Sequence, residues 1–278
     1  MITSNYTNPI LAWFSCGATS AVACKYALAL YKNVRIIYIE THSAHQDNER
    51  FIHECENWYN TKIERHESNK YKNVLDVISK MKFINSPFGA ACTYHLKKEV
   101  RYQIEKECGC WGGQVWGFEF SKKEINRAIR LQEQNPENKP LFPLIEKQLT
   151  KENCLSILLE AGIALPAMYT LGYKNNNCIG CVKGGIAYWN KIRRDFPETF
   201  KKMAEIEREI NATCIKDKDG KVFLDTLNPS RGKEETPLVP ECSLMCQIEF
   251  ENLIDKNVEE VLKGNKSIYI NNNQTHNR

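Results

Sequence analysis

The chain has 278 residues with 42% hydrophobic and 26% charged residues, and its formal net charge at pH 7 is +4. This length and apolar content support a sizeable core in one large α/β domain, or in one domain with a smaller appendage. No run of about 18 apolar residues occurs, so we expect no transmembrane helix. The N-terminal segment lacks the basic region of a signal peptide, so we expect a cytoplasmic protein without a membrane partner.

The first half of the sequence alternates segments of strand and helix character. Apolar and β-branched runs predict four strands, at residues 9–15, 34–40, 61–68 and 114–120. Periodic apolar positions predict four helices, at residues 20–32, 45–60, 71–83 and 94–107. This alternation predicts an α/β fold with a mostly parallel central sheet and helices on both faces. Ligands of such sheets bind beyond the carboxyl ends of the strands.

From about residue 150 the pattern becomes mainly helical and rich in cysteine. Thr150 fits the N-cap of a helix, and Pro197 predicts a break in a later helical stretch. Asp219 and Gly220 predict a hairpin. We therefore divide the chain into an α/β domain at 1–150, a cysteine-rich helical region packed on it at 151–263, and a mobile polar tail at 264–278.

A turn of sequence Ser-Cys-Gly-Ala-Thr-Ser, residues 15–20, joins the first predicted strand to an alanine-rich helix. Such a turn presents free backbone N–H groups, and the helix dipole favours an anion there. The hydroxyls of Ser15 and Ser20 add donors for phosphate oxygens. The pattern S-x-G-x-x-S fits both a phosphate site and a plain strand–helix turn, and it is not a Walker loop.

Twelve cysteines are many for an intracellular chain, and they favour metal binding or thiol chemistry over disulfides. Cys178 and Cys181 form a C-x-x-C in a loop rich in Asn and Gly, a spacing that places two thiolates on one metal. Further ligands for zinc or a four-iron cluster are available in Cys92, Cys242 and Cys246. A redox dithiol or free thiols are the remaining alternatives.

Several segments together resemble the phosphoadenosine phosphosulfate (PAPS) reductases, a branch of the adenine nucleotide α-hydrolase (PP-loop) superfamily. FSCGATS is similar to the loop S-G-G-x-D-S, ACTYHLKKEVR to a cysteine with a basic stretch, and GFEFSKKEINRA to G-x-R-x-x-E-S-x-x-R-A. The progression from FPLIEKQL to NNCIGC resembles P-L, a helix, P-x-x-Y and C-x-x-C. The resemblance covers residues 10–195 and implies a HUP-like fold whose first 150 residues bind an adenine nucleotide. The positions that it assigns to the nucleotide are Ser15, Cys16, Gly17, Ala18, Thr19, Ser20, Glu40, Thr41, Gly117 and Lys122.

Three departures from the family pattern bear on the nucleotide. Thr19 stands where related ATP pyrophosphatases have an Asp that helps to arrange metal and pyrophosphate, which argues against ATP cleavage. Glu40 replaces an Asp and keeps the carboxylate. Phe118 replaces an Arg expected to meet phosphate, with Lys122 and Lys123 nearby. The implied ligands are ATP, PAPS or adenosine phosphosulfate (APS), with Mg²⁺ as a candidate cofactor.

The resemblance also assigns roles to the cysteines. Iron–sulfur members of the family use cysteines that match Cys92, Cys178 and Cys181, which implies a [4Fe–4S] cluster ahead of the zinc alternative. Cys246 is the fourth candidate ligand. PAPS reductases end in an E-C-G-x-H-like segment whose cysteine attacks the sulfonate, and the segment ECS around Cys242 resembles it. Cys242 is therefore the candidate nucleophile, and the sequence leaves open that it is the fourth ligand instead.

Basic residues near these cysteines are candidate anion sites. Lys97 and Arg101 lie four residues apart and face one way on a helix, and Lys183 follows the C-x-x-C. Together they suit a sulfate, a phosphate or nucleic acid, and a solvated helix face explains them equally well. We expect Trp116 and Trp189 to lie in the core.

Three functions remain at this point. The first is an enzyme similar to PAPS reductases, which acts on a nucleotide substrate in sulfur metabolism with an electron or sulfur donor protein. The second is an ATP-dependent sulfur insertase that modifies tRNA or DNA. The third is a non-catalytic module that binds a nucleotide or zinc. The oligomeric state is not indicated by the sequence.

Overall fold

The computed structural model describes residues 8–233 and residue 238. At its centre is a five-stranded parallel sheet in the order β3-β2-β1-β6-β7. The strands are β1 (Ile10–Phe14), β2 (Val34–Glu40), β3 (Glu64–Glu67), β6 (Gly113–Val115) and β7 (Pro140–Leu141). This confirms the predicted α/β fold. The strand order reverses next to β1, so the usual ligand position of such a sheet lies at the carboxyl end of β1.

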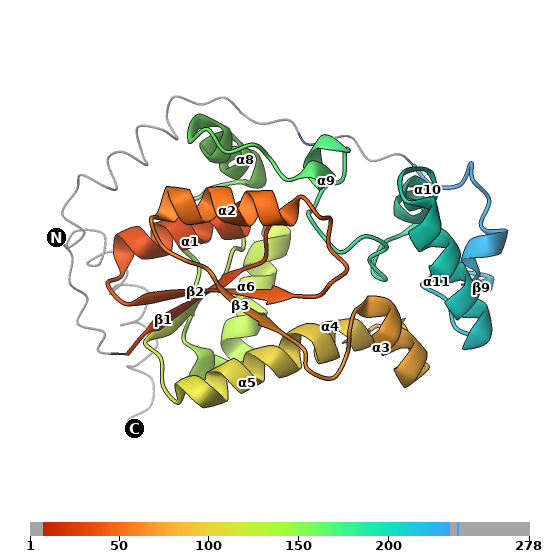
Figure 1. The fold of residues 1–278 in the computed structure, drawn as a ribbon, viewed down its shortest axis with the longest axis horizontal. Helices are drawn as coiled ribbons and strands as arrows, with labels where there is room; N and C mark the ends of the chain where they lie inside the picture. The colour runs from red at the N-terminus through yellow and green to blue at the C-terminus, as the bar shows by residue number, and fades with distance from the viewer. Residues whose placement is uncertain (1–7, 234–237, 239–278) are drawn as a thin grey trace, which may run out of the picture.

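Helices cover both faces of the sheet (Figure 1). Side chains alternate along a strand, so β1 contributes to two cores. Ile10, Ala12 and Phe14 belong to the core that includes α1 and α2, whereas Leu11 and Trp13 pack with α5 on the other face. The helices of this lobe are α1 (Ala18–Leu30), α2 (Asn48–Tyr59), α5 (Glu99–Cys108), α6 (Lys122–Gln134), α7 (Pro143–Glu146) and α8 (Lys151–Glu160).

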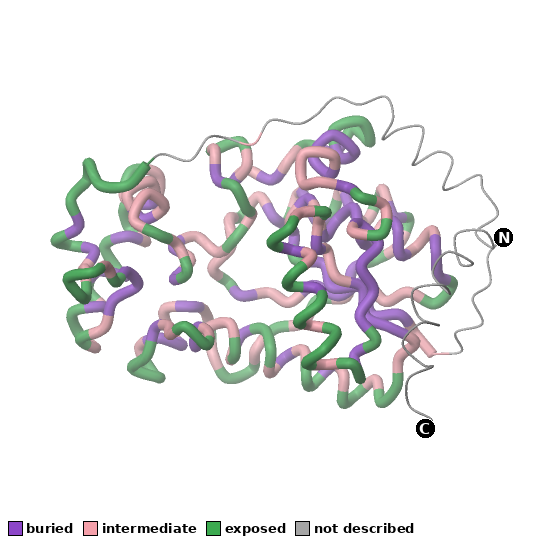
Figure 2. The backbone as a smooth tube through the Cα atoms, turned by 180° about the vertical axis from the view of Figure 1, so that it is seen from behind, coloured by how far each residue is buried: buried purple, intermediate pink, exposed green. Residues whose placement is uncertain are grey.

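A second core lies beside the sheet and takes its residues from two separate stretches, 74–96 and 168–227. Its largest fully buried side chain is Trp189, as expected from the sequence. Figure 2 shows buried segments in the sheet and again in this second lobe. By contrast α8, which follows residue 150, packs on α1. The division between the two cores therefore does not fall at a single position along the chain.

The second lobe contains short helices and hairpins. Its elements are α3 (Val74–Met81), β4 (Asn85–Ser86), β5 (Gly89–Ala90), α4 (Ala91–Thr93), the π-helical turn η1 (Tyr94–Lys98), α9 (Ala167–Thr170), α10 (Ile186–Asp195), α11 (Pro197–Glu209), β8 (Ile215–Asp217), β9 (Gly220–Val222) and the 3₁₀ turn η3 (Leu224–Thr226). A further 3₁₀ turn, η2 (Pro136–Asn138), precedes β7.

Several local predictions are confirmed. The Thr150 side chain accepts a hydrogen bond from the Asn153 N–H and caps α8. Pro197 separates α10 from α11, and β8 pairs with β9 in the predicted hairpin. The predicted fourth strand is shorter than expected, because β6 ends at Val115. No helix in the described part of the chain is long and apolar enough to cross a membrane.

Candidate functional site

The turn after β1 is closed by hydrogen bonds within the loop. The Ser20 hydroxyl oxygen accepts from the backbone N–H of Ser15 at 3.0 Å and of Gly17 at 3.3 Å, and the hydroxyl donates to the Gly17 carbonyl at 2.9 Å. Cys16 has φ 61°, in the left-handed region where glycine is usual. Its thiol is buried, which raises the pKa of Cys16 well above its usual range. Cys16 therefore shapes the turn and has little thiolate character.

Tyr169, at the end of the first turn of α9, closes the same loop from outside. Its hydroxyl accepts from the N–H of Ala18, the first residue of α1, at 3.3 Å and also from the backbone N–H of Asn176. Burial raises the pKa of Tyr169 to about 12, so the phenol is neutral. The Asn176 amide donates to the Cys16 carbonyl at 2.5 Å. The second half of the chain is thus tied directly to the loop.

Two residues assigned to the nucleotide hold other parts of the structure. A Cβ on Gly117 would lie 2.6 Å from the Cα of Ser20, so this glycine allows the segment after β6 to approach the start of α1. The Glu40 carboxylate accepts from the backbone N–H of Thr41 at 2.6 Å and of His42 at 2.7 Å, which closes the turn after β2. Lys122, in contrast, is an exposed residue at the start of α6.

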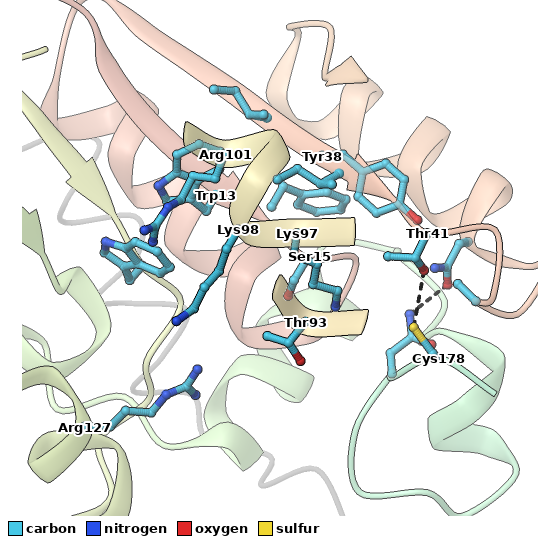
Figure 3. A pocket seen from close by; sticks show the side chains of 17 residues that line it. Trp13, Ser15, Tyr38, Thr41, Thr93, Lys97, Lys98, Arg101, Arg127 and Cys178 are labelled. Carbon is cyan, nitrogen blue, oxygen red and sulfur yellow. Dashed lines mark hydrogen bonds between the residues drawn. The ribbon is translucent and has the colours of Figure 1, made fainter. Parts of the chain in front are cut away.

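A cavity of about 270 Å³ opens at the carboxyl ends of β1 and β2 (Figure 3). Four cations line it: Lys97, Lys98, Arg101 and Arg127. None of the described residues that line it carries a carboxylate. From the loop after β1, only Ser15 reaches this cavity. The cavity therefore presents a concentrated positive charge beside the loop.

The cations differ in how they are paired. Arg101 Nε lies 3.2 Å from a Glu105 carboxylate oxygen, and Arg127 Nη1 lies 3.0 Å from Glu124. Neither Lys97 nor Lys98 has an acidic partner within residues 8–233. The two ammonium groups are therefore available to an anionic ligand.

Aromatic side chains form the adjoining wall. The rings of Trp13 and Trp116 lie 6.1 Å apart, and the Arg101 guanidinium lies 5.4 Å from the Trp116 ring. Trp13 donates to the Gln114 side chain at 2.9 Å, which fixes its ring. Flat rings beside a cation suit the base of a nucleotide. Trp116 thus lines the cavity, where the sequence predicted a core position.

The C-x-x-C turn is held at the edge of this cavity. Gly180 has φ 73°, and the Tyr188 hydroxyl accepts from the Cys181 N–H at 2.8 Å and donates to the Cys178 carbonyl at 3.1 Å. The Cys178 thiol itself lines the cavity and lies 3.3 Å from the Thr41 hydroxyl. Thr41 and Cys178 therefore meet at the carboxyl end of β2 (Figure 3).

Cys92 and Cys181 lie in the same electrostatic environment. Burial, together with the nearby thiols of Cys178 and Cys181, raises the pKa of Cys92 to about 11, whereas Lys97 and Lys183 act to lower it. The same two lysines act on Cys181, whose pKa is also raised by burial. The structure therefore brings the three predicted cysteines and two of the predicted cations into one region.

These cysteines do not by themselves form a metal site. Within the described part of the chain, no three His, Cys, Asp or Glu side chains are placed to hold a metal ion. Cys242 and Cys246 lie outside the described residues. The [4Fe–4S] cluster, its zinc alternative and the nucleophilic role of Cys242 therefore remain predictions.

The sequence matches the family profile of the phosphoadenosine phosphosulfate reductase domain over residues 9–187. This chain belongs to the PAPS reductase domain family. The match includes β1, the loop after it, the cavity cations and the C-x-x-C turn. Membership confirms the resemblance inferred from the sequence and supports nucleotide binding and oxidoreductase chemistry.

Other comparisons add less. A search of curated proteins gives no match. Among solved structures, the phosphoadenylyl-sulfate (PAPS) reductase of Candida auris, in a phosphate complex, is similar with 14% identity and a TM-score of 0.45. That alignment covers 61% of this chain and 80% of the other.

Among the residues that line the cavity, Trp13, Lys98, Arg127 and Asn176 were not predicted from the sequence. Trp13 belongs to a continuous buried strand, so its pattern is that of a core residue. Lys98 follows the predicted Lys97 directly, so the same basic stretch of the sequence could have indicated it. Arg127 comes from α6, and only the packing of that helix brings it to the cavity.

Proposed function

We propose that this chain is a sulfonucleotide reductase-like enzyme that binds an adenine nucleotide in the cavity at the carboxyl ends of β1 and β2. The observation that carries the proposal is the set of four cations, without a lining carboxylate, beside the loop of a PAPS reductase domain. The rings of Trp13 and Trp116 suit the adenine base, and the four cations suit the sulfate and phosphate groups.

The resemblance to PAPS reductases implies the reaction class, and the charge pattern of the cavity suits it. A cysteine thiolate attacks the sulfur of a phosphosulfate, an S–S bond forms, and the S–O bond to the nucleotide phosphate breaks. The nucleotide phosphate leaves with the electron pair of that bond. Lys97 and Lys98 stabilise the negative charge that develops on it. A donor dithiol then reduces the S-sulfocysteine and releases sulfite, while the dithiol becomes a disulfide.

The predicted [4Fe–4S] cluster at Cys92, Cys178, Cys181 and Cys246 remains part of the proposal, and no step above runs through it. Purification without oxygen tests it. A brown protein with stoichiometric iron and sulfide supports the cluster, whereas a colourless protein with bound zinc contradicts it. ATP-dependent sulfur insertion is not favoured by any feature of the described loop.

The activity is tested by sulfite release from PAPS and from APS in the presence of a dithiol. Lys97→Ala should lower kcat/KM by roughly 10-fold or more, because a hydrogen bond to a charged group is lost. Lys106→Ala is the matched control, since Lys106 is exposed on the continuation of the same helix and does not line the cavity. Equal activities of the two variants would contradict the proposed binding mode.

A further inference from the structure

A fourth cysteine, Cys214, lies in the same region as Cys92 and the C-x-x-C turn. It belongs to the second core, against which the partly buried side chains of Cys92 and Cys178 also pack. Cys214 itself is buried, directly before β8. It lies far from the other three cysteines in the sequence and outside any motif, so only the fold brings it to them.

One side-chain amide joins the three segments that carry these cysteines. Asn85 Nδ2 donates to the carbonyl of Val182, the residue after the C-x-x-C turn, at 2.7 Å. The same nitrogen donates to the Cys214 carbonyl at 3.4 Å. Asn85 also pairs with Ala90 in the β4–β5 hairpin, just before Cys92. The three backbone segments therefore converge on Asn85.

The backbone at Cys214 is fixed from a second side. The carboxylate of Glu207, which is fully buried in α11, accepts from the Cys214 N–H at 2.6 Å and from the Leu224 N–H at 2.7 Å. The neighbouring Thr213 hydroxyl donates to the Ile215 carbonyl at 2.7 Å. The position of Cys214 beside the other cysteines is thus built into the fold, as a metal ligand requires.

The four thiols also act on one another electrostatically. Burial and the Glu207 carboxylate raise the pKa of Cys214 above its usual range, and the thiols of Cys181 and Cys92 raise it further. Cys178 and Cys181 act on Cys92 in the same way. Cys214 therefore belongs to one connected group with the three cysteines that the sequence indicated.

Four thiolates are the donor set of a [4Fe–4S] cluster and also of a structural zinc site. In a zinc site all four sulfurs share one ion, whereas in the cluster each sulfur binds its own iron, so the sulfurs lie farther apart. Within residues 8–233, no three such side chains are placed to hold a single ion. The arrangement of these thiols therefore suits the larger cluster better than zinc.

We propose that Cys214, and not Cys246, supplies the fourth thiolate of the predicted cluster, beside Cys92 and the two cysteines of the C-x-x-C turn. This inference rests on the cluster that is part of the proposed function. It leaves Cys242 outside the cluster, where its thiol is free for the nucleophilic role that the sequence suggested.

The experiment measures iron and acid-labile sulfide in the full-length protein after purification and reconstitution without oxygen. The wild type should hold about four irons and four sulfides per chain, the composition of the cluster. Cys214→Ala should lose most of both, because one iron lacks its ligand, whereas Cys246→Ala should keep the wild-type content. Cys55→Ala is the matched control, since Cys55 is also a buried free cysteine but lies in the other core.

A thermal melt identifies a variant that fails to fold. Cys214→Ser keeps the size and polarity of the side chain and then stands in for Cys214→Ala. Its readout is the iron content together with the electron paramagnetic resonance signal of the reduced cluster, which changes when oxygen replaces sulfur on one iron.

Wild-type iron content in Cys214→Ala, or an unchanged signal in Cys214→Ser, would overturn the inference, as would loss of iron from Cys246→Ala. A wild-type protein that holds zinc or no metal would overturn it as well. Sulfite release from PAPS and APS by the same wild-type sample reports separately on the proposed function, so the two can fail independently.

Discussion

Gly117 lies against the first turn of α1, and its replacement by alanine tests whether this contact positions the loop. An added Cβ would lie 2.6 Å from the Ser20 Cα, 2.7 Å from the Ser20 nitrogen and 3.0 Å from the Thr19 carbonyl carbon. All three are backbone atoms of a helix, so no side-chain rotation relieves the overlap. The segment after β6 and the start of α1 must therefore move apart.

The expected cost follows from this overlap. Overpacking of an ordered core costs about 1–3 kcal/mol, and a clash with backbone atoms belongs at the upper end. For a chain of this size, 1 kcal/mol corresponds to about 2–4 °C in Tm. Gly117→Ala should therefore lower Tm by roughly 6–12 °C. Nucleotide affinity should fall as well, because the loop moves with the start of α1.

Scanning calorimetry measures the change in Tm, and calorimetric titration with AMP measures the affinity. Gly185→Ala is the control, since a Cβ there meets nothing within 4 Å and the residue has φ −84°. The control should change Tm by no more than about 3 °C, the cost of a weaker helix cap. If Gly117→Ala and Gly185→Ala have the same Tm, close packing at Gly117 does not support the loop.

Two other substitutions have effects whose direction follows from the structure. Asp47→Asn should lower the free energy of unfolding at neutral pH by about 1–3 kcal/mol, because a charged hydrogen-bond acceptor is lost. Arg50 holds the pKa of Asp47 below its ordinary 3.8, so this stabilisation is present above that value and is lost as the pH falls through the folded-state pKa. In urea titrations the difference from wild type should shrink in strong acid, and an equal difference at both pH values would contradict this. Tyr188→Phe removes the two hydrogen bonds that the Tyr188 hydroxyl makes with the C-x-x-C turn. Cys178 and Cys181 should then be alkylated faster than in the wild type, as measured by mass spectrometry. An unchanged alkylation rate would show that Tyr188 does not hold the turn.

The main strands could be predicted because their signal is local. The run Val34–Glu40 is rich in β-branched residues, and the predicted and observed bounds of β2 are the same. β7 was missed, since a two-residue strand that begins with Pro140 carries no periodic pattern. The composition of the two cores could not be predicted from position along the chain, because sequence order does not show that residues 74–96 pack with residues 168–227.

The candidate site was predictable where a motif carried it. The sequence alone points to the loop at residues 15–20, to Lys97 and Arg101, and to the C-x-x-C turn. The closure of the loop by Tyr169 was not predictable, because it depends on one hydroxyl meeting an N–H group 151 residues away. Pairing of this kind over long separations leaves no trace in local composition.

The two stretches that build the second core have a consequence for how the molecule can be divided. A fragment that ends at residue 150 would leave α1 without α8 and would expose the apolar sides of α3 and α4, whose partners come from residues 168–227. The complementary fragment would lack one half of the core around Trp189. Neither fragment should fold alone, so the lobe with the cysteines can be exchanged between relatives only if both stretches are transplanted together.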